Sequence, residues 1–225
     1  MIIFTDLSDV LIKGVLGVKE IINKRYDTDI AMKFVERKNE VYGQFEELMR
    51  GCITEDRFWE AFLSEGSWPF GIEEMKSFLS YNFALEIPGT FDLYRSIVKY
   101  PYSFKDERPS RTRIDGKQPE FWLISDHIAE RQEELELLHP DIFSLFKRCI
   151  WSYDEVAIKK DPGFFQRLIK KNGLNPEEIL FIDDDTNNTA AACKAGIHSV
   201  WFRNCFQLRY LLSRRGFGFA TNTDE

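Results

Sequence analysis

The sequence is poor in cysteine and histidine, with four and three of them among 225 residues. No two cysteines form a CxxC motif, and the histidines are not spaced as zinc ligands. These residues are Cys52, Cys149, Cys193, Cys205, His127, His139 and His198. Their scatter argues against a zinc site or a disulfide framework, and it indicates buried thiols in a reducing compartment.

An excess of basic residues is also missing, because thirty Lys and Arg stand against thirty-seven Asp and Glu, a net charge of −7. A dedicated nucleic-acid binder needs a basic face, so we expect no nucleic-acid partner. No apolar run approaches the ~20 residues of a membrane helix. Asp6 interrupts the apolar start before it reaches the ~7 residues of a signal-peptide core. We therefore expect a soluble, cytoplasmic protein that does not bind a membrane.

The composition that remains is that of a folded chain, with 44% hydrophobic and 15% aromatic residues. Burial of that many aromatic side chains can offset the ordering entropy of the backbone. The length suits one large domain, or one domain that carries an insert.

Short apolar runs alternate with helical patterns, which is typical of a parallel α/β sheet. The expected strands are Ile2–Thr5, Phe121–Ser125, Cys149–Ser152, Ile179–Ile182 and Ser199–Phe202. The pairs Asp161-Pro162 and Asn175-Pro176 each place a capping side chain before a proline and predict helix starts. Gly173 and Gly196 follow helical runs, where a left-handed stop is expected.

Residues 14–87 show amphipathic helical patterns and no strand of comparable strength. The expected helices are 18–26, 29–50, 55–65 and 71–83, with Thr54 as the N-cap of the third. The pattern predicts a three-layer α/β core at 1–13 and 88–225 that carries an all-helical cap at 14–87. Residues 100–120 form an irregular insert in the core, of a length that is usually functional or disordered.

Polar side chains follow three of the expected strands. Asp6 to Asp9 follow the first strand, Ser125 to His127 follow the second, and Asp183 to Asp185 follow the fourth. Ligands bind beyond the carboxyl ends of the strands in an open parallel sheet, so these groups are expected to converge. Carboxylates, a hydroxyl and the nearby Lys159 are the groups that magnesium-assisted phosphoryl chemistry requires.

Four of these segments, in order, resemble the motifs of the haloacid dehalogenase superfamily, in its phosphatase-like branch with a helical cap. They are Asp6-Leu7-Ser8-Asp9-Val10-Leu11, Ser125-Asp126, Lys159-Lys160-Asp161-Pro162, and Phe181-Ile182-Asp183-Asp184-Asp185 followed by Asn188, Ala191, Ala192 and Gly196.

The resemblance implies a Mg²⁺-dependent phosphatase that acts on a small phosphorylated metabolite, with Asp6 as the nucleophile. It implies phosphate binding by Ser125, Asp126 and Lys159. It also implies metal binding by Asp6, Asp183, Asp184 and the backbone carbonyl of Ser8, with Asp184 as the direct ligand of the last motif. It leaves the substrate and the oligomeric state open.

The sequence departs from the family pattern at Ser8, where phosphatases carry a second aspartate that protonates the leaving oxygen. Serine is a poor acid or base, and a positioned acid or base is worth roughly 10²–10⁴-fold in rate. Hydrolysis is then slow, the phosphoenzyme is long-lived, or Asp9 or Asp126 supplies the proton. The alternative is a catalytically weakened protein that binds a phospho-ligand or a protein partner. A dehalogenase also lacks the second aspartate, but it does not fit the acidic fourth motif.

Each candidate also has an ordinary structural interpretation. Ser125 and Asp126 could cap a helix, Asp183 to Asp185 could cap the helix after them, and Lys159 could be solvated. His127 and His198 are expected to be structural. Lys160 stands where the family usually has proline, which leaves Lys159 in register.

Overall fold

A parallel five-stranded sheet forms the centre of the molecule in a computed structural model that describes residues 1–99, 118–217 and 219. Its strands are β1 (Ile2–Thr5), β2 (Glu120–Ser125), β3 (Phe146–Trp151), β4 (Ile179–Asp183) and β5 (His198–Trp201). They lie in the order β3-β2-β1-β4-β5 and pair in parallel throughout. This doubly wound order confirms the predicted α/β fold and places β1 at the centre.

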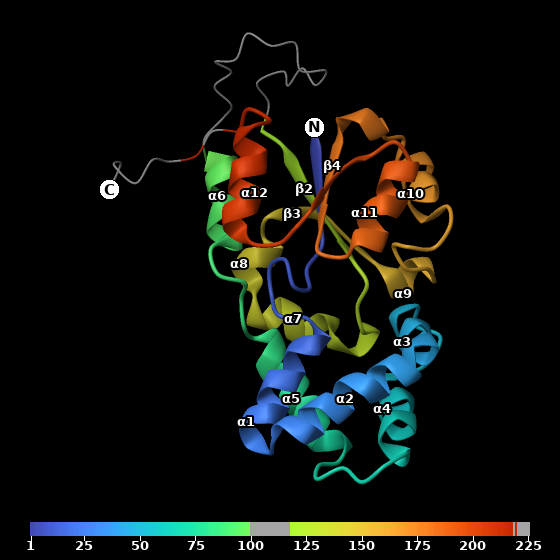
Figure 1. The fold of residues 1–225 in the computed structure, drawn as a ribbon. Helices are drawn as coiled ribbons and strands as arrows, with labels where there is room; N and C mark the ends of the chain where they lie inside the picture. Colours follow the sequence, from blue (N-terminus) through green and yellow to red (C-terminus); the bar gives the residue numbers. More distant parts are fainter. Residues whose placement is uncertain (100–117, 218, 220–225) are drawn as a thin grey trace.

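Helices cover both faces of the sheet, as Figure 1 shows. One face carries α10 (Phe164–Asn172) and α11 (Thr186–Lys194). The other carries α6 (Thr90–Lys99), α7 (Gln132–Leu138), α8 (Pro140–Phe143) and α12 (Cys205–Ser213). Side chains alternate between the two cores: Ile3 packs in the second and Phe4 in the first. The result is a helix–sheet–helix sandwich.

Helices alone follow β1 as far as α6, apart from isolated bridges at Ser8, Ile12 and Glu86. They are α1 (Val18–Arg25), α2 (Thr28–Glu40), α3 (Tyr42–Met49), α4 (Glu55–Ser64) and α5 (Ile72–Phe83), and they lie beyond one end of the sheet in Figure 1. Phe34, Phe58 and Phe62 are buried among them and pack ring against ring. A domain division at 14–87 remains a prediction.

Three predicted elements differ from the structure by more than a one-residue shift of an end. The single helix expected at 29–50 is two helices, because the buried Val41 leaves helical geometry (φ −96°, ψ 20°) and serves as the cap of both. Strand β3 begins at Phe146 rather than Cys149, since it is an edge strand whose exposed Lys147 and Arg148 hide it from a search for apolar runs.

The third difference lies at Asp161-Pro162, which does not start a helix. Helix α10 begins at Phe164, after Gly163 in a left-handed conformation (φ +80°). The Asp161 carboxylate instead accepts a hydrogen bond from the N–H of Ile158 and closes the preceding turn. The other cap predictions are confirmed: Asn175 starts a 3₁₀ turn, Thr54 caps α4, and Gly173 and Gly196 have positive φ.

Residues 100–117 of the predicted insert lie outside the described residues. Within the part of the chain that is described, no helix combines the length and the apolar character needed to cross a bilayer.

Candidate active site

The carboxyl ends of the three central strands bring the predicted site residues to one edge of the sheet. Thr5 at the end of β1 pairs with Leu123 of β2 and with Ile182 of β4. The next residue, Asp6, donates its N–H to the Ile182 carbonyl at 2.9 Å. Asp6 therefore lies beside the ends of two strands that are more than a hundred residues away in sequence.

The Asp6 side chain is held at one oxygen. Its Oδ1 accepts hydrogen bonds from the N–H of Leu7 and from Lys159 Nζ, each at 2.8 Å. Among the described residues, none donates to Oδ2. Burial raises the pKa of Asp6 well above its usual value, Lys159 opposes the shift, and Asp183 and Asp184 add to it. The carboxylate is thus fixed in position with its second oxygen available.

Lys159 is a buried cation, 1% exposed, surrounded by acids. Its Nζ donates to Asp183 Oδ2 at 2.6 Å as well as to Asp6. Its backbone N–H donates to both carboxylate oxygens of Asp126, at 3.0 and 3.3 Å. Burial lowers the pKa of Lys159, but Asp183, Asp6 and Asp126 more than offset this and raise it. The interpretation of Lys159 as a solvated surface residue is therefore wrong.

Asp183 and Asp184 have different surroundings. Asp183 Oδ1 accepts from the N–H of Asp185 at 2.8 Å and from Asn188 Nδ2 at 3.1 Å, and its Oδ2 binds Lys159. The Asp184 carboxylate accepts no hydrogen bond from another described residue. Burial, with Asp183 adding to it, raises the pKa of Asp184 to about 7. Asp184 is the carboxylate with room for a ligand.

Asn188 was not predicted as a site residue. It lies in α11, five residues after Asp183, so one helical turn brings it back over the strand end. Its position in the segment that follows Asp183 was the available sequence signal for a site residue. The sequence does not show that the Asn188 amide donates to the Asp183 carboxylate.

The two remaining predicted groups occupy different places. Ser8 lines the cavity beside Asp6. The Ser125 hydroxyl is buried, lacks a hydrogen-bond partner among the described residues, and does not line the cavity. Because an unsatisfied buried hydroxyl is costly, this orphaned group fits an acceptor that a ligand would supply. Neither Ser125 nor Asp126 caps the following helical turn, which has Ile128 at its N-cap.

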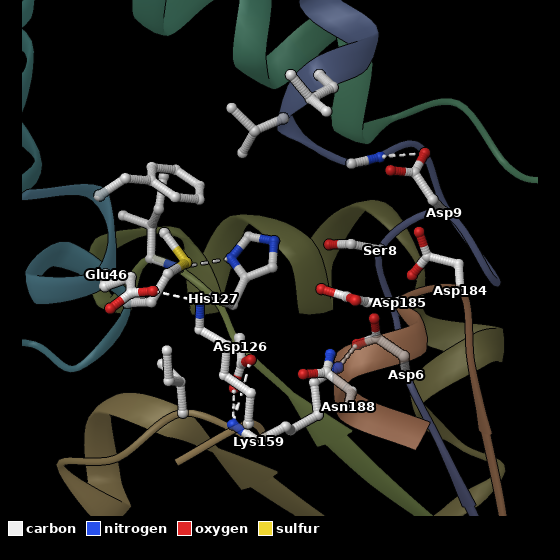
Figure 2. A pocket seen from close by; sticks show the side chains of 18 of the residues that line it. Asp6, Ser8, Asp9, Glu46, Asp126, His127, Lys159, Asp184, Asp185 and Asn188 are labelled. Atoms are coloured by element: carbon white, nitrogen blue, oxygen red, sulfur yellow. Dashed lines mark hydrogen bonds and ion pairs between the residues drawn. The ribbon is translucent and has the colours of Figure 1, made fainter. Parts of the chain in front are cut away.

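A cavity of about 190 Å³ opens above this edge, between the sheet and the helices α2 and α3. Figure 2 shows Asp6, Ser8, Asp184 and Asp185 on one side of it, and Glu46 and His127 on the other. Asp9, in a left-handed conformation (φ +56°), also lines it and accepts from the N–H of Gly14 at 3.1 Å. The helical segment contributes Val15, Leu16, Lys38, Tyr42, Phe45, Glu46 and Met49.

His127 lines the cavity and is held in place by its neighbours. Its Nδ1 accepts from the N–H of Ile128 at 2.9 Å, and its ring packs between Phe83 and Trp151. Burial lowers its pKa to about 4. The imidazole is therefore neutral near pH 7.

Lys160 connects its loop to the helical segment across the cavity. Its Nζ pairs with Glu46 of α3, donates to the Tyr42 hydroxyl at 3.1 Å and lies over the Tyr42 ring. Beside it, Arg50 binds Asp161 through two nitrogens, at 2.6 and 3.1 Å. The loop that carries Lys159 is thus tied to the helices across the cavity.

Three carboxylates could hold a metal ion. One oxygen each from Asp6, Asp183 and Asp184 lies within 4.8 Å of the others. Hard oxygen donors of this kind suit Mg²⁺, which is usually bound by one or two carboxylates with water completing the octahedron. Both raised pKa values reflect burial and crowding of negative charge, which a divalent cation would relieve.

Comparison with known proteins agrees with this geometry. A family model described as haloacid dehalogenase-like hydrolase matches residues 123–202, which contain Ser125, Lys159 and Asp183. Over these residues the chain is similar to the haloacid dehalogenase-like hydrolases.

Solved structures of the superfamily share the fold over nearly the whole chain. The HAD-hydrolase YfnB from Bacillus subtilis, bound to magnesium, is 16% identical with a TM-score of 0.66, over 94% of this chain and 97% of that one. A HAD family enzyme from Bacteroides thetaiotaomicron, in complex with magnesium and inorganic phosphate, is 18% identical with a TM-score of 0.59, over 90% and 94%. Identities this low establish the haloacid dehalogenase fold and no more.

A curated relative is much longer than this chain. Drimenol cyclase drtB from Aspergillus calidoustus is 24% identical over 164 residues, which is 73% of this chain and 28% of that protein. The chain therefore spans less than a third of this relative.

Proposed function

We propose that the chain is a Mg²⁺-dependent phosphatase that transfers a phosphoryl group from a small phosphorylated metabolite to Asp6. The observation that carries the proposal is the state of the Asp6 carboxylate. Its Oδ1 is fixed by Leu7 and Lys159, and its Oδ2 accepts no hydrogen bond from a described residue. One oxygen of Asp6 also lies within 4.8 Å of one oxygen each from Asp183 and Asp184. The magnesium in the YfnB structure and the magnesium and phosphate in the Bacteroides enzyme support the same chemistry.

The metal would be held by Asp6 and Asp184, with the Ser8 carbonyl as a further ligand. Asp183 would act mainly through its charge, because both of its oxygens already accept hydrogen bonds from Lys159, Asp185 or Asn188. When bound, the cation would neutralise charge that develops on the phosphoryl oxygens.

Asp6 Oδ2 would attack phosphorus while the bond from phosphorus to the leaving oxygen breaks. Lys159, kept protonated by the surrounding acids, would stabilise the charge on the phosphoryl group. Asp126 would contribute by holding the N–H of Lys159 and thereby the loop, rather than by direct contact. The Ser125 hydroxyl does not line the cavity, so it would donate to a phosphoryl oxygen only after its side chain turns toward the ligand.

Proton transfer is the weak step. The leaving oxygen must gain a proton, and the water that later attacks phosphorus of the phosphoaspartate must lose one. Ser8 cannot do either efficiently near pH 7. Asp9 lines the same cavity and is the alternative carboxylate, although its Oδ1 already accepts from Gly14. We therefore propose slow turnover, least impaired for leaving groups that need no proton.

The acidic cluster disfavours a dehalogenase, which does not need a metal ion. Crowded carboxylates at Asp6, Asp183 and Asp184 have a physical reason to persist if they bind a cation.

The test is hydrolysis of an activated aryl phosphate in the presence and absence of Mg²⁺. We expect turnover by the wild-type protein that Asp6→Asn and chelation both abolish. Asp154→Asn, at an exposed acid away from the cavity, is the matched control. A folded wild-type protein without turnover would instead favour the alternative, a weakened family member that binds a phospho-ligand or a protein partner.

A further inference from the structure

Lys38 occupies an unusual position on helix α2. Ala31, Phe34 and Val41 are buried, and their spacing defines the apolar stripe that this part of the chain turns inward. Lys38 lies four residues after Phe34 and three before Val41, so it falls on the same stripe. Its side chain is directed into the cavity, which it lines together with Asp6.

Lys38 is also a cation for which the described residues provide no counter-ion. Its Nζ lies over the rings of Phe45, at 4.8 Å, and Tyr42, at 5.7 Å. No carboxylate among the described residues lies within ion-pair distance of it. The other two lysines that line the cavity, Lys159 and Lys160, each have an acidic partner.

The surroundings of Lys38 make its unpaired positive charge unfavourable. Burial lowers its pKa, and only the more distant charges of Asp9 and Asp185 oppose the shift. A partly buried ammonium group gains most from an anion that is brought in by a ligand. The aromatic rings beneath Nζ hold it in place and leave its outer face toward the cavity.

The two ends of the cavity are therefore suited to two different anions. Lys159 is committed to Asp6 and Asp183, at the edge of the sheet where the phosphoryl group would react. Lys38 comes from α2, which contributes to the opposite wall with Tyr42 and Phe45 of α3. At about 190 Å³, the cavity has room for few atoms between the two.

We propose that Lys38 binds a second anionic group of the substrate, which makes the substrate class compact phosphate monoesters with a carboxylate or a second phosphate a few bonds from the first. This inference rests on the proposed phosphatase function. Asp9 and Asp185 face the same lysine, and they would repel a second anion that did not pair with it directly. Lys38 would therefore decide between substrates and not take part in the reaction at Asp6.

The test compares substrates that differ in one group. 3-Phosphoglycerate carries a carboxylate where glycerol 3-phosphate carries a hydroxymethyl group, and glycerol 1,3-bisphosphate adds a second phosphate. We expect the wild-type kcat/KM to be at least about tenfold higher for one or both substrates that carry a second anionic group than for glycerol 3-phosphate, mainly through KM. Comparing 3-phosphoglycerate with glycerol 1,3-bisphosphate shows whether the second group is a carboxylate or a phosphate.

Lys38→Met keeps the length of the side chain and removes its charge. We expect it to reduce the preference for substrates with a second anionic group about 10–100-fold, because a hydrogen bond to a charged group contributes about that factor to binding. The kcat/KM for glycerol 3-phosphate should change little. Lys38→Arg should retain most of the preference. Lys19→Met, which removes an exposed charge on α1, is the matched control and should change nothing.

A binding measurement separates this inference from the proposed function. Calorimetry with Mg²⁺ should show tighter binding of 3-phosphonopropionate than of propylphosphonate, and Lys38→Met should remove the difference. If no phosphate ester is hydrolysed but this difference is found, the phosphatase proposal fails and the Lys38 site stands. If aryl phosphate is hydrolysed without any preference for a second anion, or Lys38→Met slows all substrates equally, the Lys38 inference is wrong.

Discussion

Replacing Asp184 by Asn should have opposite effects on the metal-free and the metal-bound protein. Asp184 is partly buried beside Asp183 and accepts no hydrogen bond from another described residue. This burial and the charge of Asp183 raise its pKa to about 7 from an ordinary 3.8. In the metal-free protein its negative charge is therefore unfavourable. Asn keeps the shape of the side chain and removes the charge, so Asp184→Asn should be more stable than the wild type without metal at pH 7.5.

The pH dependence follows from proton linkage. Because the folded pKa lies above the unfolded one, the native state binds more protons than the unfolded chain between about pH 4 and 7. The free energy of unfolding of the metal-free wild type should fall as the pH rises through that window. The effect on unfolding is at most about 4 kcal/mol, and smaller because Asp184 is partly exposed to solvent. The free energy of unfolding of metal-free Asp184→Asn should not fall in this pH window.

Magnesium should reverse the order of stability. At a concentration of about 100 Kd, a ligand that binds only the native state adds about 2.7 kcal/mol. For a domain of this size that corresponds to a rise in Tm of roughly 5–10 °C. The wild type should show this shift, whereas Asp184→Asn should show less than about 2 °C.

Thermal unfolding at pH 5.5 and 7.5, in chelator or in MgCl₂, checks all three expectations. The control is Asp154→Asn, which changes an exposed acid and should follow the wild type. The reasoning is refuted if Mg²⁺ leaves the wild-type Tm unchanged, or if metal-free Asp184→Asn unfolds below the metal-free wild type at pH 7.5.

Two further predictions concern groups around the cavity. Ser8→Asp should raise the hydrolysis of alkyl phosphates by up to about 10²–10⁴-fold and change aryl phosphate hydrolysis less, because only the former needs a proton at the leaving oxygen. Phosphate release measures both rates, and a flat alkyl rate contradicts the missing-acid argument. His127 should destabilise the protein in acid, since burial holds its pKa at about 4 and the unfolded chain takes up the proton first, near pH 6.5. Between pH 7 and 4 the loss should approach about 3 kcal/mol, and His127→Gln, compared with wild type by urea unfolding in MgCl₂, should not show it.

Strand ends were the part of the site that local patterns could predict. A buried strand appears as a short apolar run, and the first polar residue after it marks the point where the backbone leaves the sheet. Asp6, Ser125 and Asp183 were located in this way, and the parallel pairing of β1 with β2 and β4 brings their strand ends together. Their catalytic and binding roles remain predictions.

Hydrogen-bond partners were the part that could not be predicted. The expected phosphate binding by Asp126 remains a prediction. The sequence did not show that its carboxylate accepts a hydrogen bond from the N–H of Lys159, 33 residues further along the chain. The sequence likewise did not show which of Asp183 and Asp184 accepts hydrogen bonds. It is Asp183, because both Asn188 and Lys159 donate to its carboxylate.

The sequence by itself determined the parallel α/β fold, the helical character of the long segment after β1 and the order of the acidic and basic groups along the sheet edge. Each of these follows from hydrophobic periodicity and from the residues that begin and end an element, which are properties of short stretches of chain. Only the tertiary structure decided that Val41 divides a helix. It also decided that, within the described part of the chain, Ser125 is buried without a hydrogen-bond partner and Lys38 lines the cavity without an acidic one. These three features depend on which groups pack against a residue. An amphipathic pattern predicts which face of a helix is buried, but it does not predict which residues contact that face.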